Sequence, residues 1–409
     1  MNDIYCKNGL SFLEVRSPFD NSFVGEVIVT SFQEISSIMN NAREGAKISR
    51  SLSRHARSEI LFKAADNIEE NSIEFAKLIA NESGKTIRHA KKEVLRCINT
   101  IRLSAEEAKR LVGEIIPFDS YVGSENRTGY FTYEPLGIIL AITPFNDPLN
   151  LVAHKLGPAF AAGNSIILKP SKLTPLSAQK LVQYLWDAGL PRDVIQIVHG
   201  GGELASGFLK QRDIRMVSFT GGPVTGEKII KEAGLKKIAM DLGGNAPVIV
   251  MADCNLIDAA ESCVSGAFWA AGQNCIGTQR IFIARSIYDS FVRCMISMTE
   301  KMNVGNPLDD TTDMGPMISE DQAIRIEKWV DEAVSQGAKV LVGHKRIGAV
   351  YFPTIIESVP HMSKCWSEEV FAPVVIVEPF DDLDEAIRLA NSSESRIIVT
   401  GKQIGRAHV

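Results

Sequence analysis

The sequence predicts an α/β fold with two α/β lobes, and three observations support that class. The chain has 409 residues, of which 45% are hydrophobic and 23% are charged, a composition close to the globular average. After Pro135, apolar runs of strand length alternate with helical patterns, as they do in βαβ units. A second alternating unit begins near Gly244. Together these features predict two or three domains.

The charge balance and the cysteines argue against several classes of function. Lysine and arginine number 44 against 49 aspartate and glutamate, a net charge of −5 with no basic stripe, which disfavours a nucleic-acid partner. The longest apolar run, residues 135–145, is about half of the ~20 residues that a membrane span needs, and no signal peptide is expected. Seven scattered cysteines without a C-x-x-C pair disfavour a disulfide framework and a metal site, and they favour a reducing cytoplasm.

The first elements along the chain are predicted to be helices. Between Arg54 and Arg110, apolar residues recur every three or four positions among charged ones, and proline is absent. This pattern predicts two or three long amphipathic helices. Residues 123–133 are polar and aromatic, which predicts a short hairpin or an arm.

Alternating strands and helices follow. After Pro135 the predicted strands are residues 137–142, 165–168, 194–198, 216–219, 238–242 and 248–251, of which the last falls after the start of the second unit near Gly244. Between the first five lie the predicted helices 149–162, 174–188, 203–209 and 225–233. This alternation predicts a parallel sheet covered on both faces. The second unit is predicted to contain helices 256–271, 287–301, 321–336 and 384–391, and strands 280–284, 340–342 and 374–377.

Three loops have the composition of a functional site, although each has a plainer interpretation. Residues 219–226 form a Gly-rich loop between a strand and a helix, where backbone N–H groups favour phosphate. The loop lacks the P-loop lysine, and an ordinary turn is the alternative. Cys275 lies in a Gly-flanked polar loop, where a thiol can be reactive, although most free cysteines are inert core residues. Asp241 ends a strand before two glycines and is either a general base or a turn residue.

Taken together, six segments between about Ser17 and Asn391 resemble the aldehyde dehydrogenase superfamily. They occur in the order that the family shows, and 275 − 241 = 34 residues separate Asp241 from Cys275. The segments are 143–146 (Thr-Pro-Phe-Asn), 169–171 (Lys-Pro-Ser), 219–221 (Phe-Thr-Gly), 242–244 (Leu-Gly-Gly), 272–275 (Gly-Gln-Asn-Cys) and 368–371 (Glu-Glu-Val-Phe). The resemblance implies a Rossmann-like NAD(P)-binding domain over residues 1–243, with an oligomerisation hairpin near 115–134, and an α/β catalytic domain over residues 244–394.

The resemblance implies a catalytic set of Cys275, Asp241 and Asn146, with no metal ion. Cys275 would attack the aldehyde carbonyl to form a thiohemiacetal, and since ordinary thiols titrate near about 8.5, the site must favour the thiolate. Asn146 and the backbone N–H of Cys275 would form an oxyanion hole, in which one donor is worth about 10²–10³ in rate. After hydride transfer to a nicotinamide, a water would hydrolyse the resulting thioester, with Asp241 in the position of the base.

The resemblance also implies a site for NAD or NADP along several strand ends. Lys169 and Glu369 align with residues that hold ribose hydroxyls, and Phe371 aligns with one that flanks the nicotinamide. The remaining residues that the matching segments assign to the cofactor are Thr143, Pro144, Phe145, Ser171, Lys172, Phe219, Thr220, Gly221, Gly222 and Leu242. Without the resemblance, Lys169 and Glu369 are better interpreted as solvated surface charges and Phe371 as core.

Three residues depart from the usual pattern of the family. Asp241 stands where most members carry Glu, which makes the base one methylene shorter. Lys172 stands where many NAD-preferring members carry Glu, and an ammonium there would tolerate or favour the 2′-phosphate of NADP. Gly222 replaces a serine of the phosphate loop and removes one hydroxyl contact.

The C-terminal residues depart most from the family. The sequence after Asn391 does not continue as the family does, and residues 404–409 match the translation of a common sequencing-library adapter. We therefore expect an artefactual tail at residues 395–409 on a truncated chain, with an incomplete catalytic domain and oligomerisation hairpin. A native locus that encodes residues 404–409 and then a stop codon would contradict this expectation.

The resemblance favours oxidation of a small aldehyde, such as a short polar aldehyde or a semialdehyde, to its carboxylic acid with NAD or NADP. A CoA-acylating aldehyde dehydrogenase and a truncated, inactive nucleotide-binding scaffold are the alternatives. We expect a cytoplasmic enzyme that forms a homodimer or homotetramer at full length and has neither a nucleic-acid nor a membrane partner.

Overall fold

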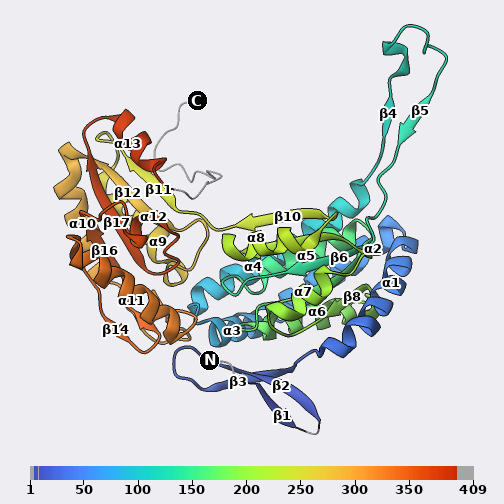
Figure 1. Ribbon diagram of the computed structural model, residues 1–409, viewed down its shortest axis with the longest axis horizontal. Coiled ribbons are helices and arrows are strands. Elements are labelled where there is room, and N and C mark those ends of the chain that lie inside the picture. Colours follow the sequence, from blue (N-terminus) through green and yellow to red (C-terminus); the bar gives the residue numbers. More distant parts are fainter. Residues whose placement is uncertain (1–3, 8, 394–409) are drawn as a thin grey trace.

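The computed structural model describes residues 4–7 and 9–393, which form two α/β lobes, a small N-terminal sheet and a projecting arm (Figure 1). The two lobes confirm the predicted fold class, because each contains a mainly parallel sheet with helices packed on it. The tail predicted at residues 395–409 lies outside the described residues.

An antiparallel sheet and one helix precede the first predicted element. Strands β1 (Ile4–Lys7), β2 (Leu10–Arg16) and β3 (Phe23–Ile28) pair in that order, and helix α1 (Ile35–Ser51) follows. The buried side chains of this sheet are Leu13, Val15 and Val27. So few buried positions leave only a weak period-two pattern in the sequence, which is why these strands were not predicted.

Residues 54–110 form three helices, as predicted: α2 (Arg54–Glu70), α3 (Ser72–Ser83) and α4 (Ile87–Arg110). The hydroxyl of Ser53 accepts a hydrogen bond from the N–H of Ala56 (3.1 Å) and so caps the start of α2. Gly84, with a left-handed φ of 75°, ends α3. In the described part of the chain, no helix combines the length and the apolarity that crossing a bilayer requires.

The sheet of the first lobe has five parallel strands in the order β10-β9-β6-β7-β8. They are β6 (Ile138–Ile142), β7 (Ser165–Lys169), β8 (Ile195–Ile197), β9 (Ile214–Gly221) and β10 (Lys237–Leu242). Every residue of β6 and β7 is buried, because helices cover both faces of the sheet. Helices α5 (Asn150–Ala161) and α6 (Pro175–Asp187) pack on one face, and α1 and α7 (Gly202–Leu209) pack on the other. Helix α8 (Pro223–Ala233) connects β9 to β10.

The sheet of the second lobe has the order β11-β12-β17-β16-β13, in which only β13 is antiparallel to its neighbour. Its strands are β11 (Ala246–Val250), β12 (Thr278–Ala284), β13 (Lys339–Val342), β16 (Thr354–Glu357) and β17 (Val374–Phe380). Its helices are α9 (Leu256–Phe268), α10 (Tyr288–Glu300), α11 (Glu320–Ser335), α12 (Lys364–Ser367) and α13 (Leu383–Ala390). Two further strands, β14 (Arg346–Ile347) and β15 (Val350–Tyr351), form a small hairpin.

The predicted elements of both lobes are present, with their ends shifted by a few residues. The helix predicted over 256–271 ends three residues early, because Ala270 and Ala271 take left-handed backbone angles (φ 51° and 55°). Strand β16 was not predicted, since it is only four residues long and directly follows Pro353.

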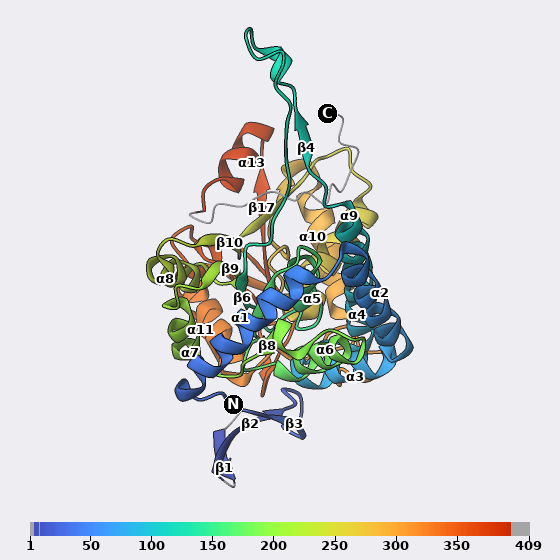
Figure 2. The same ribbon diagram turned by 90° about the vertical axis from the view of Figure 1, so that its right-hand side faces the viewer.

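An arm projects from the first lobe, as Figures 1 and 2 show from two directions. Its base is an antiparallel pair of short strands, β4 (Glu114–Ile116) and β5 (Gly129–Phe131). The hairpin or arm predicted at residues 123–133 is therefore confirmed, with its first strand further upstream. Apolar side chains along the arm are exposed, including Ile115, Val122 and Tyr130.

Candidate active site

The carboxyl ends of neighbouring parallel strands bring most of the predicted site residues to one edge of the first sheet. Thr143 follows β6 and its N–H donates to the carbonyl of Lys169 at the end of β7 (3.2 Å). On the other side of β6, Thr220 and Asp241 are paired across β9 and β10. Ligands of α/β proteins bind at this edge, because the loops that follow the strands diverge there.

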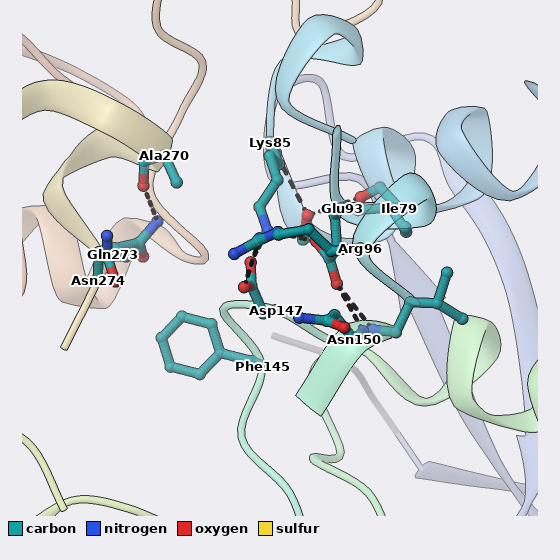
Figure 3. A network of polar contacts seen from close by, with 12 residues as sticks. Ile79, Lys85, Glu93, Arg96, Phe145, Asp147, Asn150, Ala270, Gln273 and Asn274 are labelled. Atoms are coloured by element: carbon teal, nitrogen blue, oxygen red, sulfur yellow. Dashed lines mark hydrogen bonds and ion pairs between the residues drawn. The ribbon is translucent and has the colours of Figure 1, made fainter. Parts of the chain in front are cut away.

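The loop that carries Cys275 is held by a strained backbone and by the side chain of Gln273. After Ala270 and Ala271, Gly272 also has a positive φ (67°), and a Cβ on it would lie 2.1 Å from the carbonyl oxygen of Ala372. Gln273 donates to the carbonyl of Ala270 (3.2 Å; Figure 3) and accepts from the N–H of Ile318 (2.9 Å). These contacts fix the turn, so that the thiol two residues later has a defined position.

The thiol of Cys275 is half-buried and is surrounded by negative charge. Burial raises its pKa to about 11, and the carboxylates of Asp241, Glu369 and Asp147 act in the same direction. A thiol with so high a pKa is protonated at neutral pH. This differs from the thiolate-favouring site expected from the sequence, because the charges nearest to the thiol are carboxylates rather than cations.

Asp241 lies at the exposed end of β10, where Thr220 donates a long hydrogen bond to it (Oγ1 to Oδ2, 3.4 Å). Lys155 on α5 interacts electrostatically with Asp241 and donates to the hydroxyl of Ser218 (3.1 Å). Burial lowers the pKa of Lys155 to about 8, and Asp241 opposes that shift. Lys155 was not predicted as a site residue, although a lone lysine in the apolar pattern of residues 149–162 was an available signal.

Asn146 is buried in the loop between β6 and α5, and no hydrogen bond joins its carboxamide to another residue in the described ranges. The carboxamide is therefore available as a hydrogen-bond donor. Asp147, the residue that follows Asn146, is firmly held. Asp147 accepts from Lys85 and from Arg96 (2.7 Å), and Glu93 accepts from Lys85 and from the backbone of α5 (Figure 3).

The same cations contact the lobe that carries Cys275. The ammonium of Lys85 lies 5.0 Å and the guanidinium of Arg96 5.6 Å from the ring centroid of Trp269, which precedes the Cys275 loop. Cation–π contacts of this kind join the loop of Asn146 to the loop of Cys275. The network was not predicted from the sequence, because its members come from four separate segments.

Glu369 and Phe371 reach the site from the second lobe. Glu369 accepts a hydrogen bond from the N–H of Gly244 (3.2 Å), and burial raises its pKa to about 7. The ring of Phe371, which has a left-handed φ of 47°, lies 5.9 Å from that of Phe145 and perpendicular to it. The two lobes therefore meet in front of the strand ends.

The remaining predicted cofactor residues lie along the same edge. Lys169 is buried, and burial and the neighbouring charge of Lys172 lower its pKa to about 8. Ser171 accepts from the N–H of Leu173 (3.2 Å) and so shapes the turn after β7. The others lie at the ends of β9 and β10 (Phe219, Gly221 and Leu242) or in the loops after β6 and β9 (Pro144 and Gly222). Among the residues that the structure describes, no cluster of His, Cys, Asp or Glu could hold a metal ion.

Comparison with known proteins identifies a family. A model described as "Aldehyde dehydrogenase family" matches residues 5–408. Aspartate-semialdehyde dehydrogenase 1 of Pseudomonas canavaninivorans is 57% identical over 93% of this chain and 81% of its own length. 3-Sulfolactaldehyde dehydrogenase of Priestia aryabhattai is 43% identical over 93% of this chain and 80% of its own length.

Solved structures agree with this match. Glyceraldehyde-3-phosphate dehydrogenase of Methanocaldococcus jannaschii, complexed with NADP, superposes with a TM-score of 0.89 at 36% identity, over 96% of this chain and 84% of that one. Aldehyde dehydrogenase 21 of Physcomitrella patens, in complex with the reaction product succinate, superposes with a TM-score of 0.91 at 34% identity. The match covers 96% of this chain and 83% of that one.

Proposed function

The chain belongs to the aldehyde dehydrogenase family and is an NAD(P)-dependent oxidoreductase acting on aldehydes, and we propose that Cys275 is its nucleophile. The observation that carries this proposal is the place of the thiol, half-buried on a rigid turn that contacts link to the loop of Asn146. Asp241 is near enough to raise the pKa of the thiol. The product is a carboxylic acid, formed without CoA.

The strand ends suit a nicotinamide dinucleotide. Thr143 Oγ1 is buried without a hydrogen-bond partner among the described residues, and a Cβ on Gly222 would meet no atom within 4 Å. An orphaned hydroxyl and open backbone suit the ribose and phosphate groups of such a ligand. Lys169 and Glu369 would hold ribose hydroxyls, and Phe371 would contact the nicotinamide. When bound, NAD or NADP accepts the hydride that leaves the substrate carbon.

The residues of the chain supply the other steps. Cys275 gives up its proton to Asp241, directly or through water, and its sulfur bonds to the aldehyde carbon. Asn146 and the N–H of Cys275 donate to the oxygen that becomes negative, a contribution of about 10²–10³ in rate for each donor. Once the hydride has left, Asp241 releases the thiol proton to solvent. As a carboxylate it then removes a proton from the water that attacks the thioester, and when the Cys275–carbon bond breaks, the sulfur takes that proton from Asp241. Lys155 places a positive charge that interacts electrostatically with Asp241.

We infer that the substrate is a small aldehyde with an anionic group. The relatives named for aspartate semialdehyde and for 3-sulfolactaldehyde act on aldehydes of that kind. In this chain, the guanidinium of Arg96 is half exposed beside the site, where it can attract such a group. We also place the enzyme in the cytoplasm, because none of its seven cysteines is paired in a disulfide.

The proposal is tested by steady-state assays with small aldehydes that carry or lack an anionic group, in the presence and absence of CoA. We expect reduction of NAD or NADP with the free acid as product, and a loss of about 10³-fold or more in Cys275→Ala. Cys254→Ala, which removes another half-buried thiol, serves as the control and should keep wild-type activity. An acyl-CoA product, or an active Cys275→Ala protein, would contradict the proposal.

A further inference from the structure

The segment that carries Glu369 has no regular secondary structure. Residues 368–373 connect α12 to β17 and lie outside any helix or strand. Side-chain atoms from β12 instead bind the backbone on both sides of Glu369, at the carbonyl of Glu368 and at the N–H of Val370. Backbone polar groups inside a protein need partners, and here a side chain supplies what a neighbouring strand supplies in a sheet. The position of Glu369 therefore depends on that side chain.

The side chain is that of Gln279, the second residue of β12, which is buried. Its Nε2 donates to the carbonyls of Cys365 (3.1 Å) and Glu368 (2.7 Å), and its Oε1 accepts from the N–H of Val370 (2.9 Å). A carboxamide has two donor protons on its nitrogen and an acceptor oxygen. Because both ends of the amide are bound, it has one orientation, and the peptide groups around Glu369 are fixed to it.

A second buried amide, that of Asn245, joins the same segment to the turn that follows β10. Its Nδ2 donates to the carbonyl of Glu368 (3.3 Å), and the N–H of Gly244 donates to Oε1 of Glu369 (3.2 Å). A Cβ on Gly243 would lie 1.9 Å from Oε2 of Glu369, so the carboxylate packs directly against this turn. The backbone and the carboxylate of Glu369 are therefore held by different residues.

The two amides differ in their other partners. Oδ1 of Asn245 accepts from Nε of Arg280 (2.8 Å), and this guanidinium is fully buried. Replacing Asn245 would leave a buried charge without one of its partners, which destabilises the fold. The partners of Gln279 named above are neutral backbone groups. Gln279 is therefore the residue whose replacement isolates the effect on Glu369.

We propose that Gln279 is a positioning residue for the cofactor and acts through Glu369, because it fixes the backbone of residues 368–370 and with it the carboxylate. The inference rests on the cofactor role proposed above for Glu369 and not on the identity of the aldehyde. A carboxylate on a fixed segment loses little conformational freedom when a ribose hydroxyl binds to it. It therefore contributes more to the affinity for the cofactor than a carboxylate on a loosely held segment.

Calorimetric titration with NADP and with NAD, in the absence of aldehyde, tests the proposal. Gln279→Met keeps the length of the side chain but removes its hydrogen bonds. We expect it to weaken cofactor binding by about 5–10-fold, a coupling typical of residues in one hydrogen-bond network. Gln211→Met is the control, because it removes a hydrogen bond of the same kind just after α7 (Nε2 to the carbonyl of Gly207, 3.1 Å). It should leave both affinities within about 2-fold of the wild type.

A double-mutant cycle distinguishes positioning from a merely structural role. Glu369→Gln should by itself weaken cofactor binding. Adding Gln279→Met to it should then change the affinity by no more than about 2-fold, because the carboxylate through which Gln279 acts is absent. If Gln279 only supported the fold, its replacement would weaken binding equally in both backgrounds. If Gln279→Met does not fold, Gln279→Glu takes its place in the cycle, since it keeps the acceptor for the N–H of Val370.

Two results would overturn the proposal. One is wild-type affinity for both cofactors in a folded Gln279→Met protein. The other is an equal loss of affinity with and without the carboxylate of Glu369. Wild-type affinity in Glu369→Gln alone would refute the cofactor role of Glu369, and this inference with it. None of these titrations bears on the role of Cys275, which is tested by turnover.

Discussion

At the scale of single residues, the role proposed for Asp241 depends on the length of its side chain. Its carboxylate is one methylene shorter than the usual base of the family, yet the structure gives it two neighbours that hold it in place. Thr220 donates to one oxygen at 3.4 Å, and Lys155 provides a positive charge nearby. These two interactions hold the carboxylate at the end of β10, where we propose that it activates the water that hydrolyses the thioester.

Removing the charge of Asp241 should separate the two halves of the reaction. In Asp241→Asn we expect a rapid burst of about one reduced cofactor per Cys275, followed by turnover about 10²-fold or more below wild type, because a general base contributes at least that much. Stopped-flow absorbance of the reduced cofactor measures both phases. Asp241→Glu is the matched variant and should retain turnover. A wild-type steady state in Asp241→Asn would show that another group activates the water.

At the scale of elements, one buried cation contacts both loops that carry the proposed catalytic residues. Lys85, between α3 and α4, binds Asp147 and Glu93 and lies under Trp269, so it links the loop of Asn146 to the loop of Cys275. Burial raises the pKa of Glu93 to about 7, and the charge of Lys85 opposes this shift. The ionised form of Glu93 is therefore favoured by Lys85. Because Lys85 is buried and contacts both Asp147 and Trp269, we propose that it acts through these residues as a positioning residue.

Lys85→Met should lower kcat by about 10-fold or more and leave the KM for the cofactor unchanged, because a displaced Asn146 weakens the oxyanion hole. It should also lower the unfolding free energy by about 3–5 kcal/mol, since it leaves buried carboxylates without their partner. Lys85→Arg should recover part of kcat, which a merely structural role does not predict.

Steady-state kinetics and thermal unfolding measure these effects. Lys91→Met is the control on the same helix, because Lys91 forms only an exposed ion pair with Asp310 (3.2 Å) and should contribute about 0–1 kcal/mol. If Lys85→Met does not fold, Asp147→Asn weakens the same Lys85–Asp147 contact by removing the carboxylate charge, while Lys85 keeps Glu93 as a partner. An unchanged kcat in a folded Lys85→Met protein would exclude the positioning role.

At the scale of the whole molecule, the arm exposes apolar side chains that no other part of the described chain covers. Its two strands are short, and Ile115, Val122 and Tyr130 are 81%, 88% and 74% exposed. A two-stranded ribbon with exposed apolar side chains is marginally stable in water, so we expect the arm to pack against another subunit in a homodimer or homotetramer.

Replacing Tyr130 by Glu should dissociate the oligomer into smaller species, because Tyr130 pairs with Ile115 across the ribbon and a charge there opposes burial. Sedimentation velocity measures the change. Ile347→Glu, at an exposed apolar residue on the β14–β15 hairpin, is the control and should leave the sedimentation coefficient unchanged. A wild-type protein that sediments as a monomer would contradict the expectation.

The sequence by itself determined much of the local structure and predicted the residues of the site. Helical periodicity identified α2 to α4, and apolar runs between turn residues identified β6 to β10, because both signals arise within a few neighbouring residues. The matching segments named Cys275 and Asp241, which the structure places near enough to interact electrostatically. In β1 to β3 the period-two pattern of apolar residues is weak, and the same reasoning predicted no strands there.

Only the tertiary structure decided which distant groups meet and what charge they carry. Lys85 and Asp147 are 62 residues apart in the chain, and Lys155 and Ser218 are 63 apart, so no local pattern connects them. The raised pKa of Cys275 likewise depends on burial and on carboxylates from separate segments. Desolvation and Coulomb interactions act through space, and the fold alone sets those distances.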